Sequence, residues 1–427
     1  MARSQPSRSP LSAILATLSA SVFIALSWAP AASANLQNSP KRLVDQAWQL
    51  VYRDYAHPNF DHDAWCQKRQ SLLSRAYRSK QQAYRTIRKA LNSLNDPHTR
   101  FLAPTAFDSL RNRTQGERSG VGLRFQRDRQ ASPPIVQDVL KGSPAQAADI
   151  RTGDRLVAID GRTARSLSAE QAIQHLRGRP GTEVTLQLAR PDQGRRQLTL
   201  TRERIEVPAV RYRIRQADGT AIGYIRLQAF NDNAAGEMRQ AIADLNAQGV
   251  AGFVLDLRSN PGGLLEAGVD IARLWLDGGK IVRVANGKDP DRRFRAREPA
   301  LTDRPLAVLV DGESASASEI LAGALKDHNR AVIVGTPTYG KGTVQSVREL
   351  ADGSGLAVTV SRFYSPNGTD IAADGITPDR KVVRLPPRGK RSDGGRDNQY
   401  ERAVAALTER IQQSDEVAAG TPPSLGQ

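Results

Sequence analysis

The chain has 427 residues, of which 39% are hydrophobic and 25% are charged. This length and composition exclude a disordered chain and allow two or three domains. The single cysteine, Cys66, cannot form an intramolecular disulfide, so packing must stabilise the fold. Cys66 falls in a helical stretch with no glycine-rich turn to expose it, which predicts a buried, inert thiol and argues against a cysteine nucleophile.

The formal net charge of +17 favours anionic partners, membrane headgroups among them. The basic residues are scattered and aromatic residues make up only 5% of the chain, so no nucleic-acid partner is predicted. No cluster of histidines, cysteines and carboxylates has the spacing of metal ligands, so we expect neither a metal nor a cofactor.

Residues 1–34 have the pattern of a secretory signal peptide. Two arginines precede an apolar stretch from Leu11 to Trp28, and residues 32–34 supply the small side chains that signal peptidase requires. An uncleaved membrane anchor is the alternative, although serines and alanines dilute the apolar stretch. No paired arginines precede it, so the sequence predicts export by the ordinary secretory route.

Three types of pattern follow along the chain. Residues 35–118 have apolar residues at helical spacing, which predicts an N-terminal helical domain. Residues 119–206 change to short β-runs with one helix at 169–176, which predicts a compact β-rich module. Residues 386–427 comprise a loop rich in proline, glycine and charge, then a stretch at 400–412 that suits a helix.

Between these parts, residues 207–385 alternate short apolar strands with helices. This alternation predicts an α/β core whose parallel strands are buried on both faces. The expected strands are 222–227, 253–257, 306–310 and 331–334. The expected helices are 235–247, 265–276 and 315–326.

Ser316 follows a buried strand and a tight turn, at the point where a helix begins. A serine there is surrounded by unpaired backbone N–H groups and the positive end of the helix dipole, which favours a developing oxyanion. N-capping is the alternative role for such a serine. Because Ser314 and Ser318 stand beside it, the segment has room for one cap and one nucleophile.

A nucleophilic serine needs a base, and the chain offers five histidines: His57, His62, His98, His175 and His328. Four lie outside the α/β core and are expected to be ordinary surface residues, while His328 is about 18 Å away along the helix. Lys341 follows a strand that runs back about 17 Å, which returns the chain to Ser316. Burial can lower a lysine pKa towards neutrality, so Lys341 is the predicted general base.

Two glycine-rich segments bear on this chemistry. Gly262 follows a buried strand, and its amide together with that of Ala317 is predicted to form an oxyanion hole. The segment around Lys341 also resembles a phosphate-binding P-loop, but Gly342 replaces the required serine or threonine. Residues 356–360 suit a strand rather than the phosphate-capping helix, so a nucleotide site is not favoured.

Four motifs in this order resemble those of the C-terminal processing, or tail-specific, serine peptidases. They are 256–263 (DLRSNPGG), 314–319 (SASASE), 338–345 (TYGKGTVQ) and 364–379 (YSPNG…GITPD). The resemblance implies a crotonase- or ClpP-like α/β protease core with an inserted PDZ domain and an N-terminal helical domain.

The same resemblance assigns roles to individual residues. It implies that Ser316 is the nucleophile and Lys341 its base, oriented in some members by a glutamine at the position of Gln345. It puts the oxyanion-hole amides on Gly262 and Ala317. It also implies a structurally important aspartate at Asp327.

The module at 119–206 is similar to the PDZ domain of this family. Its carboxylate-binding loop would consist of Gly120, Val121, Gly122 and Leu123. The backbone N–H groups of such a loop hold a C-terminal carboxylate, so the expected partner is a protein substrate with a free C-terminus. A turn glycine is the alternative role for Gly122. Arg177 resembles an arginine that in some members links PDZ binding to active-site assembly.

The amino-terminal helices and residues 96–99 resemble the branch of the family found in oxygenic phototrophs. That branch processes a photosystem II reaction-centre precursor in the thylakoid lumen, so the expected location is the periplasm or the thylakoid lumen. Two other functions remain open. One is a PDZ-containing scaffold with an inactive core, and the other is a crotonase-like acyl-CoA enzyme, which would hardly carry an export signal and a PDZ domain.

Overall fold

The computed structural model describes residues 39–126, 133–191, 193–385 and 397–420. The predicted signal peptide and the loop predicted from residue 386 to 396 lie outside these described residues. No helix among the described residues combines the length and the apolar character that crossing a membrane requires.

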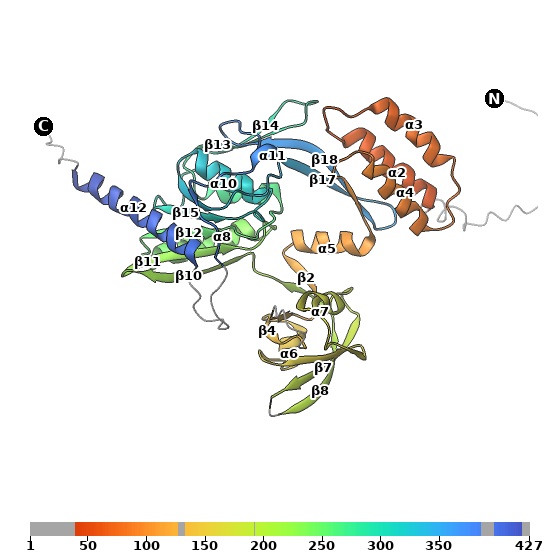
Figure 1. The fold of residues 1–427 in the computed structure, drawn as a ribbon, viewed down its shortest axis with the longest axis horizontal. Coiled ribbons are helices and arrows are strands. Elements are labelled where there is room, and N and C mark those ends of the chain that lie inside the picture. The colour runs from red at the N-terminus through yellow and green to blue at the C-terminus, as the bar shows by residue number, and fades with distance from the viewer. Residues whose placement is uncertain (1–38, 127–132, 192, 386–396, 421–427) are drawn as a thin grey trace, which may run out of the picture.

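Three helices form the amino-terminal part from residue 39 to residue 93, as the sequence predicts (Figure 1). They are α2 (Pro40–Asp54), α3 (His62–Leu73) and α4 (Lys80–Asn92). Each begins at a polar side chain that accepts a backbone N–H of the first turn, which satisfies one of the donors that a helix leaves unpaired. Their apolar faces pack together and against Leu356 and Val358, two residues from the far end of the chain.

Cys66 lies on α3 but is exposed, so the prediction of a buried thiol is wrong. Neighbouring residues on an α-helix point about 100° apart because one turn takes 3.6 residues. Trp65 occupies the inward position on α3 and is buried, which leaves the next residue facing solvent.

A β-rich unit follows, after β1 (Arg100–Leu102) and α5 (Pro104–Thr114). Its strands are β2 (Glu117–Gly120), β3 (Leu123–Phe125), β4 (Val136–Val139), β5 (Arg155–Ile159), β6 (Arg162–Thr163), β7 (Glu183–Arg190), β8 (Gly194–Thr201) and β9 (Glu203–Glu206), and its helices are α6 (Pro144–Ala147) and α7 (Ala169–Leu176). The first strand of the unit, β2, pairs with its last strand, β9, so the chain enters and leaves the unit at one place. The unit has its own hydrophobic core, in which Leu156 and Leu186 are fully buried.

The α/β core is built on a six-stranded sheet in the order β10-β11-β12-β15-β16-β19. The strands are β10 (Val210–Ala217), β11 (Thr220–Leu227), β12 (Gly252–Asp256), β15 (Leu306–Val310), β16 (Ala331–Gly335) and β19 (Arg380–Lys381). From β11 to β19 all neighbours are parallel, while β10 is antiparallel at one edge. Every residue of β12 and β15 is buried, which confirms the predicted strands covered on both faces.

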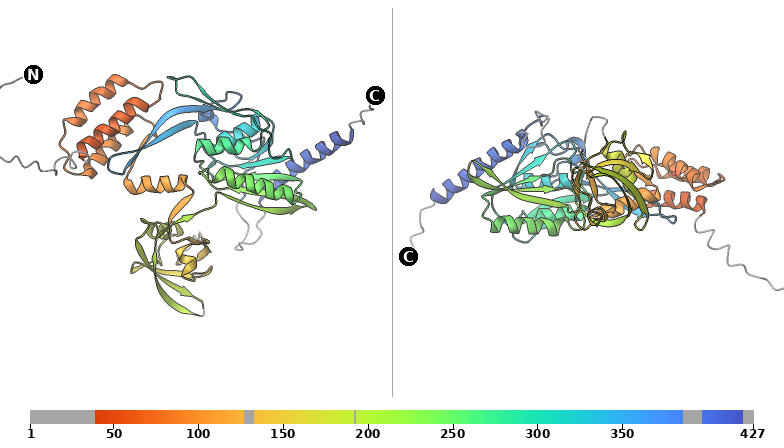
Figure 2. Two further views of the ribbon diagram at one scale, coloured as in Figure 1. Left: turned by 180° about the vertical axis from the view of Figure 1, so that it is seen from behind. Right: turned by 90° about the horizontal axis from the view of Figure 1, so that it is seen from below.

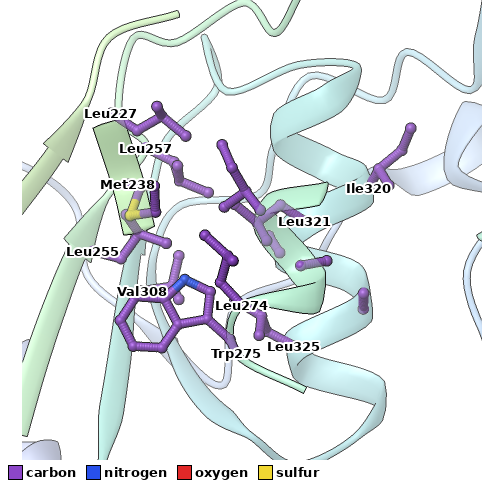
Figure 3. Packing of buried hydrophobic residues seen from close by; sticks show 14 of the residues in the cluster. Leu227, Met238, Leu255, Leu257, Leu274, Trp275, Val308, Ile320, Leu321 and Leu325 are labelled. Carbon is purple, nitrogen blue, oxygen red and sulfur yellow. The ribbon is translucent and has the colours of Figure 1, made fainter. Parts of the chain in front are cut away.

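Helices cover the two faces of this sheet. On one face lie α8 (Ala234–Ala247), α9 (Leu265–Arg273) and α10 (Ala317–Asp327), and on the other lies α12 (Asn398–Gly420). Figure 3 shows Trp275 among the leucines of the first face, where its ring meets Phe253 edge-on with centroids 5.3 Å apart. On the second face, Ala403 and Leu407 of α12 pack against strand residues, so the helix predicted at 400–412 is confirmed.

An antiparallel sheet joins the α/β core to the amino-terminal helices (Figure 2). It contains β1, β13 (Gly279–Ala285), β14 (Arg292–Ala296), β17 (Thr343–Glu349) and β18 (Gly355–Tyr364), and the short helix α11 (Ile371–Asp374) follows β18. Strand β18 pairs with β17, β13 and β1. Through β18, the segment that follows α4 therefore reaches the part of the chain that follows Lys341.

We predict that Leu407→Ala lowers the free energy of unfolding by about 2–5 kcal/mol, because truncating a fully buried leucine removes apolar contacts and leaves a cavity. Urea denaturation measures the change. Thr408→Ala on the exposed face of the same helix is the control, and its effect should stay within about 0.5 kcal/mol. Equal effects of the two substitutions would mean that α12 does not stabilise the sheet.

Candidate active site

Ser316 immediately precedes α10, in a backbone conformation that non-glycine residues rarely adopt. Its φ is 57° and its ψ is −114°. Such strain costs about 1–3 kcal/mol and is characteristic of functional sites. The neighbouring serines have structural partners: Ser314 Oγ donates to the Leu257 carbonyl at 2.9 Å, and Ser318 Oγ donates to the Asn260 carbonyl at 2.8 Å. Of the three serines, Ser316 is the one that the turn strains.

Glu319, in the first turn of α10, joins the Ser316 turn to the loop that carries Lys341. Its side chain is fully buried. One carboxylate oxygen accepts the backbone N–H of Ser316 at 2.8 Å and that of Lys341 at 2.9 Å. The other oxygen accepts the Thr338 hydroxyl and the Gly340 N–H, both at 2.6 Å. Two backbone nitrogens that share one acceptor lie within a few ångströms of each other, so the structure brings the predicted serine and lysine together.

The surroundings of Lys341 favour its neutral form. Burial lowers the pKa of the Lys341 amine below its ordinary value, and the positive charge of Arg100 lowers this pKa further. The negative charges of Glu319 and Asp96 act in the opposite direction without reversing the shift. A neutral amine can accept a proton, and the lowered pKa makes this form available at lower pH than in an ordinary lysine, which suits general-base chemistry.

Gly262 lies directly against the Ser316 turn. Its φ is +92°, and a Cβ on it would approach the Ala315 carbonyl oxygen to 2.6 Å and the Ala317 nitrogen to 2.8 Å. Only glycine fits such a position. The Gly262 N–H donates to Asn260 Oδ1 at 3.0 Å. The Ala317 N–H is in the first turn of α10, where a helix leaves donors without an intrahelical acceptor.

Two further predicted residues, Gln345 and Asp327, form hydrogen bonds with residues other than Ser316 and Lys341. Gln345, on β17, donates its side-chain N–H groups to Thr343 Oγ1 at 2.9 Å and to Thr359 Oγ1 at 3.4 Å. Asp327 lies at the opposite end of α10 from Ser316, and its carboxylate accepts the Ser365 hydroxyl at 2.6 Å and the Asn367 N–H at 2.9 Å. Asp327 therefore connects the C-terminal end of α10 to the residues that follow β18.

The histidines follow the sequence prediction with one exception. His57, His62 and His175 are exposed, and His328 lies at the far end of α10, where its ring contacts the Lys280 carbonyl. His98 is half-buried, so the prediction of a surface residue is wrong for it. Burial lowers the pKa of the His98 imidazole, and repulsion from Lys341 lowers it further. Among the described residues, no group of three or more histidines, cysteines and carboxylates could hold a metal ion.

The predicted PDZ loop, residues 120–123, joins β2 to β3. The Val121 carbonyl accepts the Ala145 N–H at 3.0 Å, and the Gly122 carbonyl accepts the Leu140 N–H at 2.9 Å. A Cβ on Gly122, whose φ is +85°, would lie 2.2 Å from Ser143 Cβ, so this position requires glycine. Arg177 is exposed at the C-terminal end of α7, the helix that packs against β3.

Comparisons with known proteins agree with this geometry. The model of peptidase family S41 matches residues 221–382, and that of the PDZ domain matches residues 109–189. A carboxyl-terminal-processing protease of Synechocystis is 40% identical over 370 residues, which cover 86% of this chain and 87% of that protein. The chain belongs to peptidase family S41. It is a PDZ-containing serine endopeptidase of the carboxyl-terminal-processing type.

Two further proteins of known type are similar to this chain. The chloroplastic carboxyl-terminal-processing peptidase 2 of Arabidopsis thaliana is 42% identical to this S41 peptidase, over 80% of this chain and 69% of the relative. The solved structure of a photosystem II D1 C-terminal processing protease is 37% identical, with a TM-score of 0.54, and the match covers 81% of this chain and 93% of that one. These likenesses support the peptidase fold with an inserted PDZ domain that the sequence predicts.

No role in the site was predicted for Glu319 or for residues 96–99. The first was detectable, because Ser316 and Glu319 have the serine-x-x-glutamate spacing in which a glutamate reaches back to the N-cap amide. The second was not, because its partner Thr359 lies on β18, far along the chain.

We predict that Glu319→Gln lowers kcat/KM at least about a hundredfold, because an amide presents N–H groups to donors and leaves buried donors unpaired, at about 1–3 kcal/mol each. Peptide cleavage by the folded variant measures the loss. The exposed Glu298→Gln is the control and should cleave at the normal rate. Normal cleavage by Glu319→Gln would show that the carboxylate does not maintain the site.

Proposed function

We propose that Ser316 and Lys341 form the catalytic dyad of this peptidase. The neutral Lys341 amine removes the proton of the Ser316 hydroxyl as Oγ attacks the carbonyl carbon of the scissile bond. The protonated lysine then gives its proton to the leaving amine, and a covalent acyl-enzyme remains. Water, activated by the same amine, attacks the ester carbon and restores the serine.

The negative charge on the substrate oxygen needs donors near Ser316. In this proposal the Ala317 N–H is one donor, favoured by its place at the start of α10. The Gly262 N–H is the second, and it exchanges its bond to Asn260 Oδ1 for a bond to the oxyanion. Gln345 keeps the lysine loop in position from β17.

The observation that carries the proposal is the shared carboxylate of Glu319. It holds the backbone of Ser316 in a strained turn and the backbone of Lys341 beside it. A scaffold with an inactive core would need neither the strain nor a half-buried lysine with a lowered pKa. The dyad therefore explains features that the scaffold alternative leaves without a purpose.

We further propose that residues 120–123 bind the α-carboxylate of the substrate through backbone N–H groups. Arg177 then transmits occupancy of the PDZ domain to the catalytic centre. The place of Arg177 supports such a link, since it ends α7, the helix that packs against β3 next to the loop.

The natural setting in this proposal is an exported one. The signal-peptide pattern at residues 1–34 directs the chain through the secretory route, to the periplasm or the thylakoid lumen. A protease named for processing the C-terminus of the photosystem II D1 protein is among the structural neighbours. We propose a precursor of that kind, with a short C-terminal extension, as substrate. The basic surface suits contact with an anionic membrane that holds such a precursor.

The dyad predicts that cleavage rises with pH to an inflection below the ordinary lysine value of about 10.4. The sign follows from the base, since only the neutral amine accepts a proton and a lowered pKa makes this form available at lower pH. Peptide kcat/KM, measured from acidic to alkaline pH, gives the inflection. Ser316→Ala and Lys341→Ala should each abolish turnover, and the double variant should lose nothing more, because the two residues act as a unit.

His328→Ala is the control for this experiment, because His328 lies at the other end of α10 from Ser316. It should keep both the rate and the inflection. Substantial proteolysis by the folded Lys341→Ala enzyme at neutral pH would refute the dyad.

Amidation of the substrate's C-terminus should weaken capture by about ten- to a hundredfold, because a charge-assisted hydrogen bond is worth roughly 1.5–3 kcal/mol. The measurement is cleavage of one peptide as the free acid and as the amide. If Arg177 transmits PDZ occupancy, Arg177→Ala should lower turnover of the acid and reduce the difference between the two peptides. Equal rates on acid and amide with the intact enzyme would contradict selection of C-termini by residues 120–123.

A further inference from the structure

The segment at residues 96–99 connects the amino-terminal helices to the catalytic half of the molecule, and the proposed mechanism does not use it. It precedes β1, whose first residue, Arg100, pairs with Ala357 on β18. On β18, Thr359 pairs with Gln345 of β17, four residues beyond Lys341. The segment therefore lies across one strand from the side chain that the family resemblance links to the lysine.

A continuous series of hydrogen bonds crosses that strand. Asp96 accepts the Thr99 hydroxyl at 2.6 Å and the His98 N–H at 2.9 Å. The Thr99 oxygen accepts the Thr359 backbone N–H at 3.0 Å. The oxygen of the Thr359 side chain in turn accepts from Gln345 at 3.4 Å.

The hydrogen bonds of this series are important because the threonines that form them are buried. Thr99 and Thr359 keep only 4% and 5% of their surface exposed, so water cannot readily replace their partners. The Thr99 hydroxyl donates to the Asp96 carboxylate, so its oxygen is directed elsewhere, and here that oxygen meets the Thr359 N–H. Although burial opposes ionisation, the bonds from Thr99 and from the His98 N–H help to hold the pKa of Asp96 below its ordinary value. The carboxylate is therefore a strong acceptor at neutral pH.

A local turn would not require the whole series. The two bonds that Asp96 accepts, from the His98 N–H and the Thr99 hydroxyl, suffice to close a turn of this type. The bond from the Thr359 N–H to the Thr99 oxygen joins residues 260 positions apart in the chain and serves no local purpose. Asp96 and Arg100 also act electrostatically on Lys341.

We propose that residues 96–99 form a positioning element of the active site, in which Asp96 orients Thr99, Thr99 fixes the Thr359 backbone on β18, and the Thr359 hydroxyl holds Gln345 beside the lysine loop. The amino-terminal helices thereby complete the catalytic centre when they pack onto β18. This inference rests on the proposed function, in which Lys341 is the base. Asp96, Thr99 and Thr359 act through Gln345 and touch no substrate.

Thr359→Val tests the proposal, because valine keeps the shape of the side chain and removes the hydroxyl. The backbone bond from residue 359 to Thr99 remains. We expect kcat to fall about tenfold, the worth of one hydrogen bond in a charged series, with KM unchanged. Thr359→Ser should restore kcat, because the hydroxyl is present again. Thr302→Val is the control, since Thr302 is also buried, at 8% exposed, but bonds to Asn246 away from the site.

A double-mutant cycle separates positioning from simple loss of packing. Thr359→Val combined with Gln345→Leu should lower kcat no more than Gln345→Leu alone, because the hydroxyl acts through Gln345. Losses that add, or a Thr359→Ser variant as slow as Thr359→Val, would overturn the proposal. Wild-type kcat in Thr359→Val would overturn it as well.

The pH profile provides an independent readout. The charged or titratable groups that act on Lys341 are Arg100, Glu319, Asp96 and His98. Asp96→Asn removes a negative charge that raises the pKa of the base, so the inflection should move to lower pH. Thr359→Val changes no charge and should leave the inflection in place. An inflection unmoved by Asp96→Asn would contradict the placement of the segment against the base.

The same variants distinguish failure of the catalytic dyad from failure of the positioning element alone. If the folded Lys341→Ala enzyme still cleaves, the dyad fails and the positioning proposal fails with it. If Lys341→Ala is inactive while Thr359→Val matches Thr302→Val, the dyad stands and only the positioning proposal is lost.

Discussion

The buried carboxylate of Glu319 accepts four hydrogen bonds, from two segments that are adjacent in space but not in sequence. A charge without partners in a protein interior would be prohibitively costly, so this carboxylate is stable only when all four donors are in place. Two of the donors are the amides of Ser316 and Lys341, so the condition that makes the buried charge tolerable also brings these residues together. The start of α10 contributes, since its dipole favours a negative group in the first turn.

The parallel sheet brings these donors within reach. Strands β15 and β16 are parallel neighbours, so both end at the same edge, and α10 is the connection between them. Ser316 comes after the first strand and Lys341 after the second. This much was predictable, because both strands are almost uniformly apolar and the lengths of helix and strand match. Local pattern gave β15 its observed bounds, and the chain's return to Ser316 followed from its geometry.

Other parts of the site could not be predicted from local pattern. Thr99 and Thr359 are far apart in sequence. The strands that carry Gln345 and Thr359 show no alternation, since β17 has no buried residue and β18 begins with five buried residues in a row. The engagement of the Gly262 N–H by Asn260 depends on side-chain conformation, which spacing does not determine. The exposure of Cys66 was not predictable either, because α3 has few apolar residues to indicate which of its faces points inward. Pairing across a sheet and the choice of a helix face require the folded partner.

The proton affinity of Lys341 depends on more than one part of the molecule. Arg100 and Asp96, from the segment after the amino-terminal helices, act on it in opposite directions, and Glu319 from the α/β core adds to the second. Displacing the segment that follows the amino-terminal helices would therefore change the electrostatic field at the amine. The proton affinity of this base is set only when that segment and the α/β core are packed together, so the amino-terminal part of the chain contributes to the chemistry as well as to the fold.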